Sequence, residues 1–144
     1  MQKLNANYVI GLVDGEGSFT VYVRNPKKDS NVARRVKVEP RFYLKLTEED
    51  KNILYALQNF FGCGSVYFQK DTRVNHKNCY RFEVFNRSDL QNKIIPFFRK
   101  HSLQLPSKKR DFTLFVKLMS YIEKGEHNTD SGLQKIYNIK QKMH

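Results

Sequence analysis

Two stretches in the first third of the chain alternate between apolar and polar side chains. Residues 18–24 do so around Phe19, Val21 and Val23, and the longer stretch 36–46 does so around Phe42, Leu44 and Leu46. A period of two is typical of a β-strand with one buried face, so both stretches are predicted to be strands. Residues 26–33 between them are rich in Pro, Lys, Asp, Ser and Asn, which predicts a flexible hairpin tip.

A second pair of alternating stretches follows further along the chain. Residues 65–69 and 79–86 are joined by a polar segment, 70–77, and Tyr80, Phe82 and Val84 alternate within the second of them. We therefore expect a second hairpin.

Helical patterns flank the two hairpins. Residues 5–14 form a short, strongly apolar segment, so we expect a helix that is buried nearly all round. Thr47 and Asp50 resemble a capping box, which predicts a helix from there to Phe61 that is ended by Gly62 and Gly64.

Three more helices are predicted in the second half of the chain. Ser88 is the expected N-cap of the first, and a longer helix is expected after Pro106. The stretch Gly125 to Thr129 reads as a break, and residues 130–143 form a basic amphipathic helix.

The element order defines the expected fold. An αββαββα arrangement with further C-terminal helices is an α+β fold with one four-stranded antiparallel sheet. The length of 144 residues suits one domain over 1–144.

The net charge of the chain narrows the classes of partner that it can be expected to bind. Lys and Arg number 26 against 14 Asp and Glu, which gives a formal charge of +12, and the basic residues are spread along the chain. A folded basic domain favours a polyanionic partner, above all nucleic acid, although a basic housekeeping domain such as a ribosomal protein has the same charge. No apolar run approaches the roughly 18 residues of a membrane span, so no membrane partner is expected.

The polar face of the predicted sheet is the candidate nucleic-acid surface. Basic, aromatic and amide side chains occupy alternate positions of the strands, the same parity, and so lie on one face of the sheet. An antiparallel ribbon of this kind fits the major groove of DNA. Stacking of RNA bases on the tyrosines is the competing use of such a face. The candidate DNA-binding residues are Thr20, Tyr22, Arg24, Arg35, Lys37, Arg41, Tyr43, Lys45, Tyr67, Gln69, Arg73 and Arg81.

The two cysteines do not indicate a metal site or a disulfide framework. Cys63, His76 and Cys79 match no familiar zinc spacing and lack a fourth ligand. Two thiols without a repeated pattern favour a reducing, intracellular compartment.

The segment that links the first helix to the first strand carries a specific motif. Residues 8–19 read YVIGLVDGEGSF. They closely resemble the signature of the LAGLIDADG homing endonucleases, in the variant found in intron-encoded, single-motif members. The resemblance extends over nearly the whole chain and implies the αββαββα fold that the patterning predicts. A dinucleotide-binding loop is excluded, because here a helix precedes the glycines and a strand follows them.

The resemblance implies a metal-dependent active site at the end of this helix. Glu16 and the Gly15 carbonyl would hold Mg²⁺, or another divalent cation such as Mn²⁺ or Ca²⁺. The negative end of the helix dipole and a hard carboxylate oxygen suit such a cation on physical grounds. Lys108 matches the family's basic residue near the scissile phosphate, with Lys109 as the neighbouring alternative.

Three further residues of this region have less specific matches. Glu48 stands where the family often has a Gln that orders water, but it also suits the first turn of a helix as an ordinary acid. Lys51 is a weaker basic candidate. Asp14 is expected to brace the helix pair rather than to bind metal.

A single copy of the motif implies a homodimer. Gly11 and Gly15 lie four residues apart on one helix face, where missing side chains allow a second helix to approach, and Tyr8 and Leu12 complete the expected interface. The implied activity is cleavage of both strands of a long, pseudo-palindromic DNA target, which promotes intron mobility.

Two other functions remain open at this stage: an RNA-binding intron maturase, and a DNA-binding regulator without catalysis. The expected location is a bacterial or archaeal cytoplasm, or an organelle matrix for an organelle-encoded chain.

Overall fold

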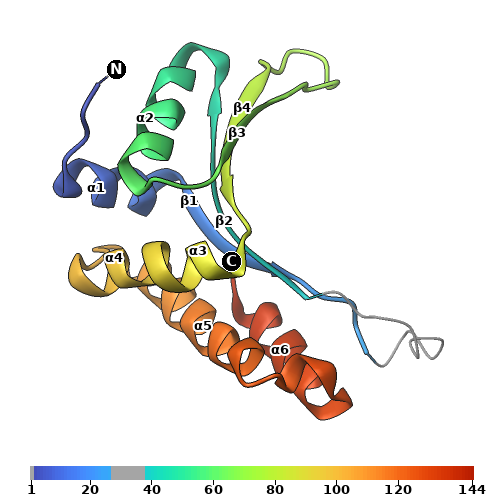
Figure 1. Ribbon diagram of the computed structural model, residues 1–144. Helices are drawn as coiled ribbons and strands as arrows, with labels where there is room; N and C mark the ends of the chain where they lie inside the picture. The colour runs from blue at the N-terminus through green and yellow to red at the C-terminus, as the bar shows by residue number, and fades with distance from the viewer. Residues whose placement is uncertain (1, 27–37) are drawn as a thin grey trace.

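The computed structural model describes residues 2–26 and 38–144 (Figure 1). Its strands and helices follow the predicted order. The elements are α1 (Ala6–Glu16), β1 (Gly17–Tyr22), β2 (Glu39–Thr47), α2 (Lys51–Phe61), β3 (Ser65–Gln69), β4 (Cys79–Val84), α3 (Arg87–Asp89), α4 (Ile95–Lys100), α5 (Pro106–Glu123) and α6 (Asp130–Lys142). Short 3₁₀ turns span Glu48–Asp50 and Glu126–Asn128, and a π-helical turn spans Leu90–Ile94. Arg35, Lys37 and most of the predicted hairpin tip lie outside the described residues.

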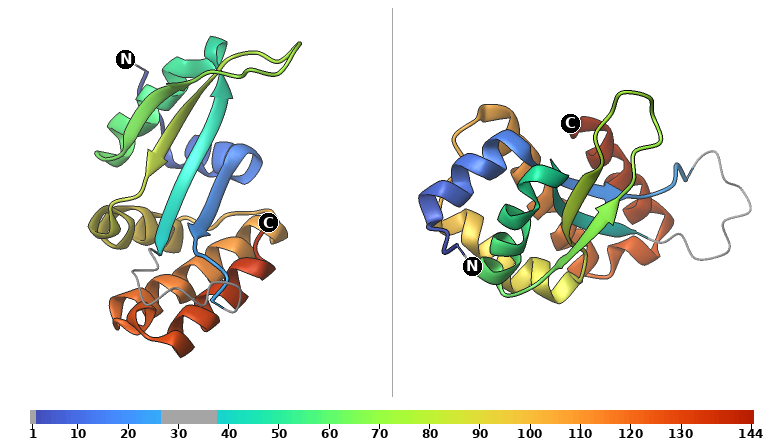
Figure 2. Two further views of the ribbon diagram at one scale, coloured as in Figure 1. Left: turned by 90° about the vertical axis from the view of Figure 1, so that its right-hand side faces the viewer. Right: turned by 90° about the horizontal axis from the view of Figure 1, so that it is seen from above.

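The four strands form one antiparallel sheet in the order β1-β2-β4-β3. Helices α1 and α2 lie against one face, and Figure 2 (left) shows the opposite face with these helices behind the strands. Helices α5 and α6 lie together at one end of the sheet, where α5 contacts β1. The predicted α+β fold is confirmed.

An aromatic core fills the space between the sheet and the helices. Phe19 and Phe42 stack with ring centroids 5.0 Å apart, and Phe98 meets both rings edge-on. Phe19, Phe42 and Phe82 are fully buried, as the alternation in their strands predicts. Each of these phenylalanines occupies the parity that faces the helices, so the polar parity is left on the open face.

The first helix is less buried than its composition suggests. Val9, Ile10, Val13 and Asp14 are buried, whereas Tyr8 is 44% exposed and lies on the uncovered side. The expectation of burial nearly all round is therefore wrong for this chain by itself. The helix also ends two residues later than predicted, at Glu16.

A close approach fixes the junction between α1 and β1. A Cβ atom added at Gly17 would lie 2.6 Å from Cγ1 and 2.9 Å from the carbonyl oxygen of Val13. No other residue fits there without displacing the helix end, so Gly17 sets the direction in which Glu16 leaves the helix.

Two predicted helix caps are wrong. Thr47 makes no side-chain capping bond, because a 3₁₀ turn separates it from α2. Asn86 rather than Ser88 caps α3, by accepting a hydrogen bond from the Asp89 amide. The predicted end at Gly62 is confirmed, since this residue adopts the left-handed conformation, at φ 68°, in which glycine ends a helix.

No helix within residues 2–26 and 38–144 combines the length and the apolar character that crossing a bilayer requires.

Candidate active site and nucleic-acid interface

Glu16 is the last residue of α1, and it lines a cleft of about 480 Å³. The carboxylate is exposed, and no described residue forms a hydrogen bond or ion pair with it. The end of β2 and the loop between β3 and β4 form the other walls. The lining residues are Glu16, Lys45, Leu46, Thr47, Asp50, Asp71, Arg73, His76, Lys77 and Cys79.

Two residues predicted for DNA binding, Lys45 and Arg73, therefore lie in the same cleft as Glu16. Arg73 is held by Asp71, which accepts bonds of 3.0 Å from Nε and 2.8 Å from Nη2. These bonds from Arg73 hold the pKa of the Asp71 carboxyl well below its usual range. Lys45 is partly buried at the end of β2.

Lys108 reaches the same junction from α5. Its Nζ donates a hydrogen bond to the carbonyl oxygen of Gly17, the residue directly after Glu16. The structure thus brings Lys108 to the residue that follows Glu16, 91 positions away in the sequence, although Lys108 is not among the residues that line the Glu16 cleft. Lys109 is exposed at the next position of the helix.

Asp14 explains why α5 begins at this place. Its buried carboxylate accepts hydrogen bonds from the amides of Gln104, at 3.0 and 3.1 Å, and of Leu105, at 3.2 Å. These amides directly precede Pro106, the first residue of α5, so Asp14 ties the motif helix to the helix that carries Lys108.

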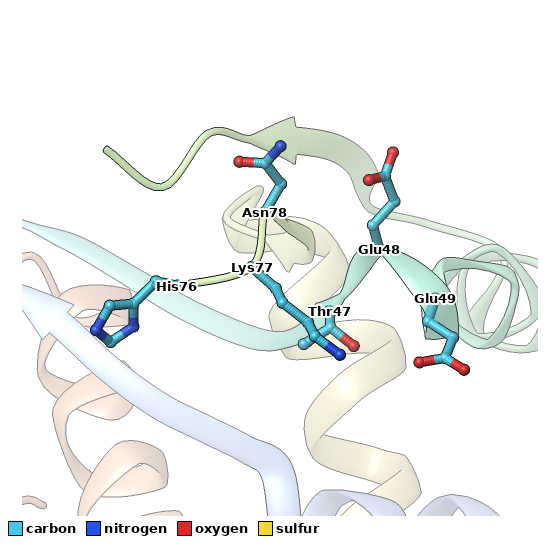
Figure 3. A pocket seen from close by; sticks show the side chains of 6 residues that line it. All are labelled: Thr47, Glu48, Glu49, His76, Lys77 and Asn78. Carbon is cyan, nitrogen blue, oxygen red and sulfur yellow. The ribbon is translucent and has the colours of Figure 1, made fainter. Parts of the chain in front are cut away.

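Glu48 and Lys51 lie apart from the Glu16 cleft. Glu48 lines a neighbouring pocket with Thr47, Glu49, His76, Lys77 and Asn78, and its side chain points away from that of Glu49 (Figure 3). The Nζ of Lys51 lies over the ring of Tyr80, 5.3 Å from its centroid. The residues of the 3₁₀ turn thus line two different pockets, and Asp50 rather than Glu48 lines the cleft at Glu16.

The donors at the end of α1 fit a hydrated divalent cation. Within the described chain no three acidic, His or Cys side chains gather closely enough to form a closed metal site. Mg²⁺ does not require such a cage, because it keeps several waters and binds through one or two carboxylates together with phosphate oxygens. Glu16 and the Gly15 carbonyl at the negative end of a helix are donors of this type.

The predicted DNA-binding residues of the strands that the structure describes lie on the polar face of the sheet, as their alternation predicts. Cross-strand neighbours in the register are Thr20 and Arg41, Lys45 and Arg81, and Tyr67 and Arg81. Tyr22 is 51% and Tyr67 39% exposed, and Arg24 is exposed just beyond β1. These candidates share one surface, with the side chain of Gln69 at its β3 edge.

The sequence interpretation missed an acid in the middle of this basic face. Glu83 is 4% exposed and accepts hydrogen bonds from Arg41 Nη1 at 2.9 Å, Arg81 Nη2 at 3.2 Å and the Tyr67 hydroxyl at 2.8 Å. Burial raises the pKa of Glu83, but the Tyr67 hydrogen bond and the two guanidinium charges outweigh it and hold this pKa below its usual range. The alternation of β4 puts Glu83 on the same parity as Arg81, which was the available signal.

A second missed residue comes from α6. The Nζ of Lys140 lies 5.7 Å from the ring centroid of Tyr22, and Lys140 lines a pocket of about 430 Å³ on the polar face with residues of β1, β2 and β4. The positive surface thus extends beyond the strands onto the C-terminal helix. The position of Lys140 on this face depends on how α6 packs against the sheet, and the sequence pattern within α6 does not indicate that packing.

The exposed side of α1 carries the expected interface residues. Cβ atoms added at Gly11 and Gly15 would meet nothing within 4 Å in the described chain. Tyr8 is exposed beside them, and Leu12 is partly buried. This face of α1 is open, and Gly15 lies directly before Glu16 at the end of the helix.

Together these features define a class: an α+β domain with a basic and aromatic sheet face, as expected of a nucleic-acid-binding surface, and a carboxylate at the end of a glycine-bearing helix. Comparison with known families matches residues 9–119 to the LAGLIDADG endonucleases. The chain belongs to this family.

Individual relatives agree with the family assignment. The chain is 32% identical over 135 residues, 92% of its length, to the probable intron-encoded endonuclease 2 of Neurospora crassa, of which the match covers 28%. The chain spans about a quarter to a third of the length of the first curated relatives that it matches.

Solved structures match over the whole fold. The crystal structure of a homing endonuclease, I-TnaI, is 37% identical with a TM-score of 0.82, and the match covers 99% of this chain and 90% of that one. I-SmaMI bound to cleaved DNA is 32% identical with a TM-score of 0.81 over 99% of this chain and 44% of that one. The same protein bound to an uncleaved DNA target in the presence of calcium ions is 33% identical, with a TM-score of 0.79 over 96% and 44% of the two chains.

Proposed function

We propose that the chain is a site-specific DNA endonuclease that acts as a homodimer and depends on Mg²⁺. The observation that carries the proposal is the meeting of Glu16, Lys108 and the open glycine face at one end of α1. In this proposal the protein acts inside the cell, in the compartment that holds its DNA target, and promotes the mobility of the intron that encodes it.

The open face of α1 supports the dimer. Two copies that pack these faces together bring two Glu16 carboxylates to one two-fold axis, because Glu16 ends the same helix. This chain matches 44% of the I-SmaMI chain, so I-SmaMI is long enough to hold two such units in one chain, whereas this chain would need a second copy. The exposed Tyr8 and the partly buried Leu12 then become interface residues.

The sheet supports a duplex as substrate. A curved, four-stranded face with Arg, Lys, Tyr and Gln side chains suits the major groove, and a symmetric pair of such faces suits two half-sites of about ten base pairs each. Lys140 on α6 and Arg73 at the hairpin tip would extend the contact to phosphates beyond the bases read by the strands.

Each residue at the end of α1 has a distinct task in this proposal. Glu16 and the Gly15 carbonyl hold the cation, which when bound activates water and stabilises the developing phosphate charge. Lys108 donates one N–H to Gly17, so two N–H groups of its ammonium remain for a phosphate oxygen. Lys45, which lines the Glu16 cleft, adds a second positive charge.

The proposal is tested by selecting DNA that the purified protein cuts from a library of duplexes with about 20 randomised base pairs. We expect cleaved duplexes to share one pseudo-palindromic sequence, in buffer with Mg²⁺ and not with a chelator in excess. Sedimentation should show two copies of the chain per duplex. Binding of DNA without cleavage at any divalent-ion concentration would contradict the proposal and favour a regulator.

A further inference from the structure

Glu83 sits where the proposed DNA surface should be most basic. Its buried carboxylate bonds to the guanidinium groups of Arg41 and Arg81, and both arginines are on the DNA-facing parity of the sheet. A buried acid opposes binding to a polyanion, so its presence there requires a physical reason.

Each arginine is held from two sides. Arg41 donates through Nη1 to Glu83 and through Nη2 to Glu39, both at 2.9 Å. Arg81 bonds to Glu83 at 3.2 Å, while its guanidinium carbon lies 3.6 Å from the ring centroid of Tyr43, in a cation–π contact. Tyr67 fixes the second oxygen of Glu83 at 2.8 Å.

The network cancels charge but preserves hydrogen-bond donors. The charges of Arg41 and Arg81 are balanced by those of Glu39 and Glu83, so Lys45 and Lys140 supply the unbalanced positive charge around these two arginines. A guanidinium has five N–H donors, of which these carboxylates use two on Arg41 and one on Arg81. The Nε–H of each arginine is buried without a partner in the described chain, so the donors left for DNA are the remaining N–H groups of the terminal nitrogens, which the network holds in fixed directions.

Fixed direction matters for reading bases and matters little for attraction to phosphates. Arginine recognises guanine through two parallel hydrogen bonds, which need a defined orientation of the planar group. Attraction to phosphates needs only a mobile positive charge, and it is the part of binding that is independent of sequence.

We propose that Glu83 is a positioning residue for DNA recognition: it holds Arg41 and Arg81 as oriented base-reading groups and prevents them from acting as sequence-independent phosphate contacts. The inference rests on the proposed function, since it assumes that this face binds duplex DNA. Glu83 itself touches no substrate in this account.

The test compares Glu83→Gln with wild type and with Glu123→Gln, which removes the same charge from an exposed position at the end of α5. The selected duplex and its single-base variants are used for competition binding, and a duplex of unrelated sequence for the salt dependence of binding. Circular dichroism and thermal melting verify that each variant is folded.

Glu83→Gln should lose about 5- to 150-fold of discrimination at the base pairs that Arg41 and Arg81 contact, and keep it elsewhere. On the unrelated duplex, the slope of log K against log salt should steepen by about 0.9 for each arginine that moves to a phosphate. Glu123→Gln should match wild type in both measurements. A merely structural role of Glu83 would weaken binding evenly and leave the pattern of base preference unchanged.

Glu83→Asp separates position from charge and serves as the second variant. It keeps the negative charge but draws the carboxylate back by one methylene, so it should relax the same base preferences. If discrimination in Glu83→Gln equals that of wild type, or if Glu83→Asp is fully selective while Glu83→Gln is not, the inference is wrong. A wild-type chain that binds no duplex would instead overturn the proposed function.

Discussion

Replacing Asp14 by alanine removes the brace between the motif helix and α5. The buried carboxylate accepts three short contacts from two backbone amides, those of Gln104 and Leu105, and no other described acceptor serves these amides. A hydrogen bond to a charged group contributes about 1.5–3 kcal/mol, and the two amides lose their partner together. We therefore expect Asp14→Ala to lower the free energy of unfolding by about 3–6 kcal/mol, a large share of the 5–15 kcal/mol typical of a domain.

Urea unfolding of Asp14→Ala, followed by circular dichroism, measures this loss directly. Glu123→Ala is the matched control, because it removes an exposed acid and should change the unfolding free energy by less than about 0.5 kcal/mol. Since Asp14 also sets the start of α5, DNA cleavage should fall even under conditions in which the variant is fully folded. A cost below about 1 kcal/mol with unchanged cleavage would refute the bracing role.

Three other perturbations probe separate parts of the account. Gly11→Leu should abolish the dimer in sedimentation experiments while the monomer stays folded, because its side chain meets open space within the chain; dimers of wild-type affinity would contradict the proposed interface. The pKa of Glu83 is held below its usual range, so its contribution to stability is present above the unfolded-state pKa and is lost as pH falls through the folded-state value. Acid unfolding curves should therefore be shallower for Glu83→Gln, and identical curves would remove the electrostatic argument. Phe42→Ala should cost about 3–5 kcal/mol in denaturant unfolding, because Phe42 is fully buried between Phe19 and Phe82; a loss under 1 kcal/mol would mean that this aromatic cluster is not the core.

The strands were predictable because their signal is local. Alternation in residues 18–24 and 79–86 assigns each side chain to a face, and the register confirms that Phe19 and Phe82 face the helices while Arg81 faces away. A period of two leaves little freedom once one face is apolar. The same alternation also puts Glu83 on the polar face, but Glu83 was not among the candidates because only basic, aromatic and amide side chains were considered there.

Helix caps and the burial of α1 were not predictable in the same way. Capping depends on backbone angles at one residue, and the 3₁₀ turn after Thr47 removes the geometry that a capping box needs. The apolar composition of α1 does not tell whether its surface is covered by its own chain or by a partner. The exposed side at Tyr8 and Gly11 shows that this chain covers only part of it.

The active-site residues differ in how far sequence alone could place them. Glu16 follows from a compact motif, whereas the position of Lys108 beside Gly17 depends on the packing of α5 and was implied only by the family resemblance. Lys45, Asp50 and Arg73 line the Glu16 cleft although they come from a strand, a turn and a loop. No short-range pattern relates these segments, because the sheet register and the hairpin loop bring them together.

Cleavage of the selected duplex by Glu16→Gln decides whether the end of α1 is the catalytic centre. The substitution keeps size and polarity but removes the carboxylate charge, and the Glu16 side chain is exposed, so folding and dimerisation should be unaffected. We expect this variant to bind the duplex with wild-type affinity in the presence of Mg²⁺, or more tightly, and to cut neither strand. Cleavage by Glu16→Gln at the wild-type rate would contradict the proposal that the end of α1 is the catalytic centre.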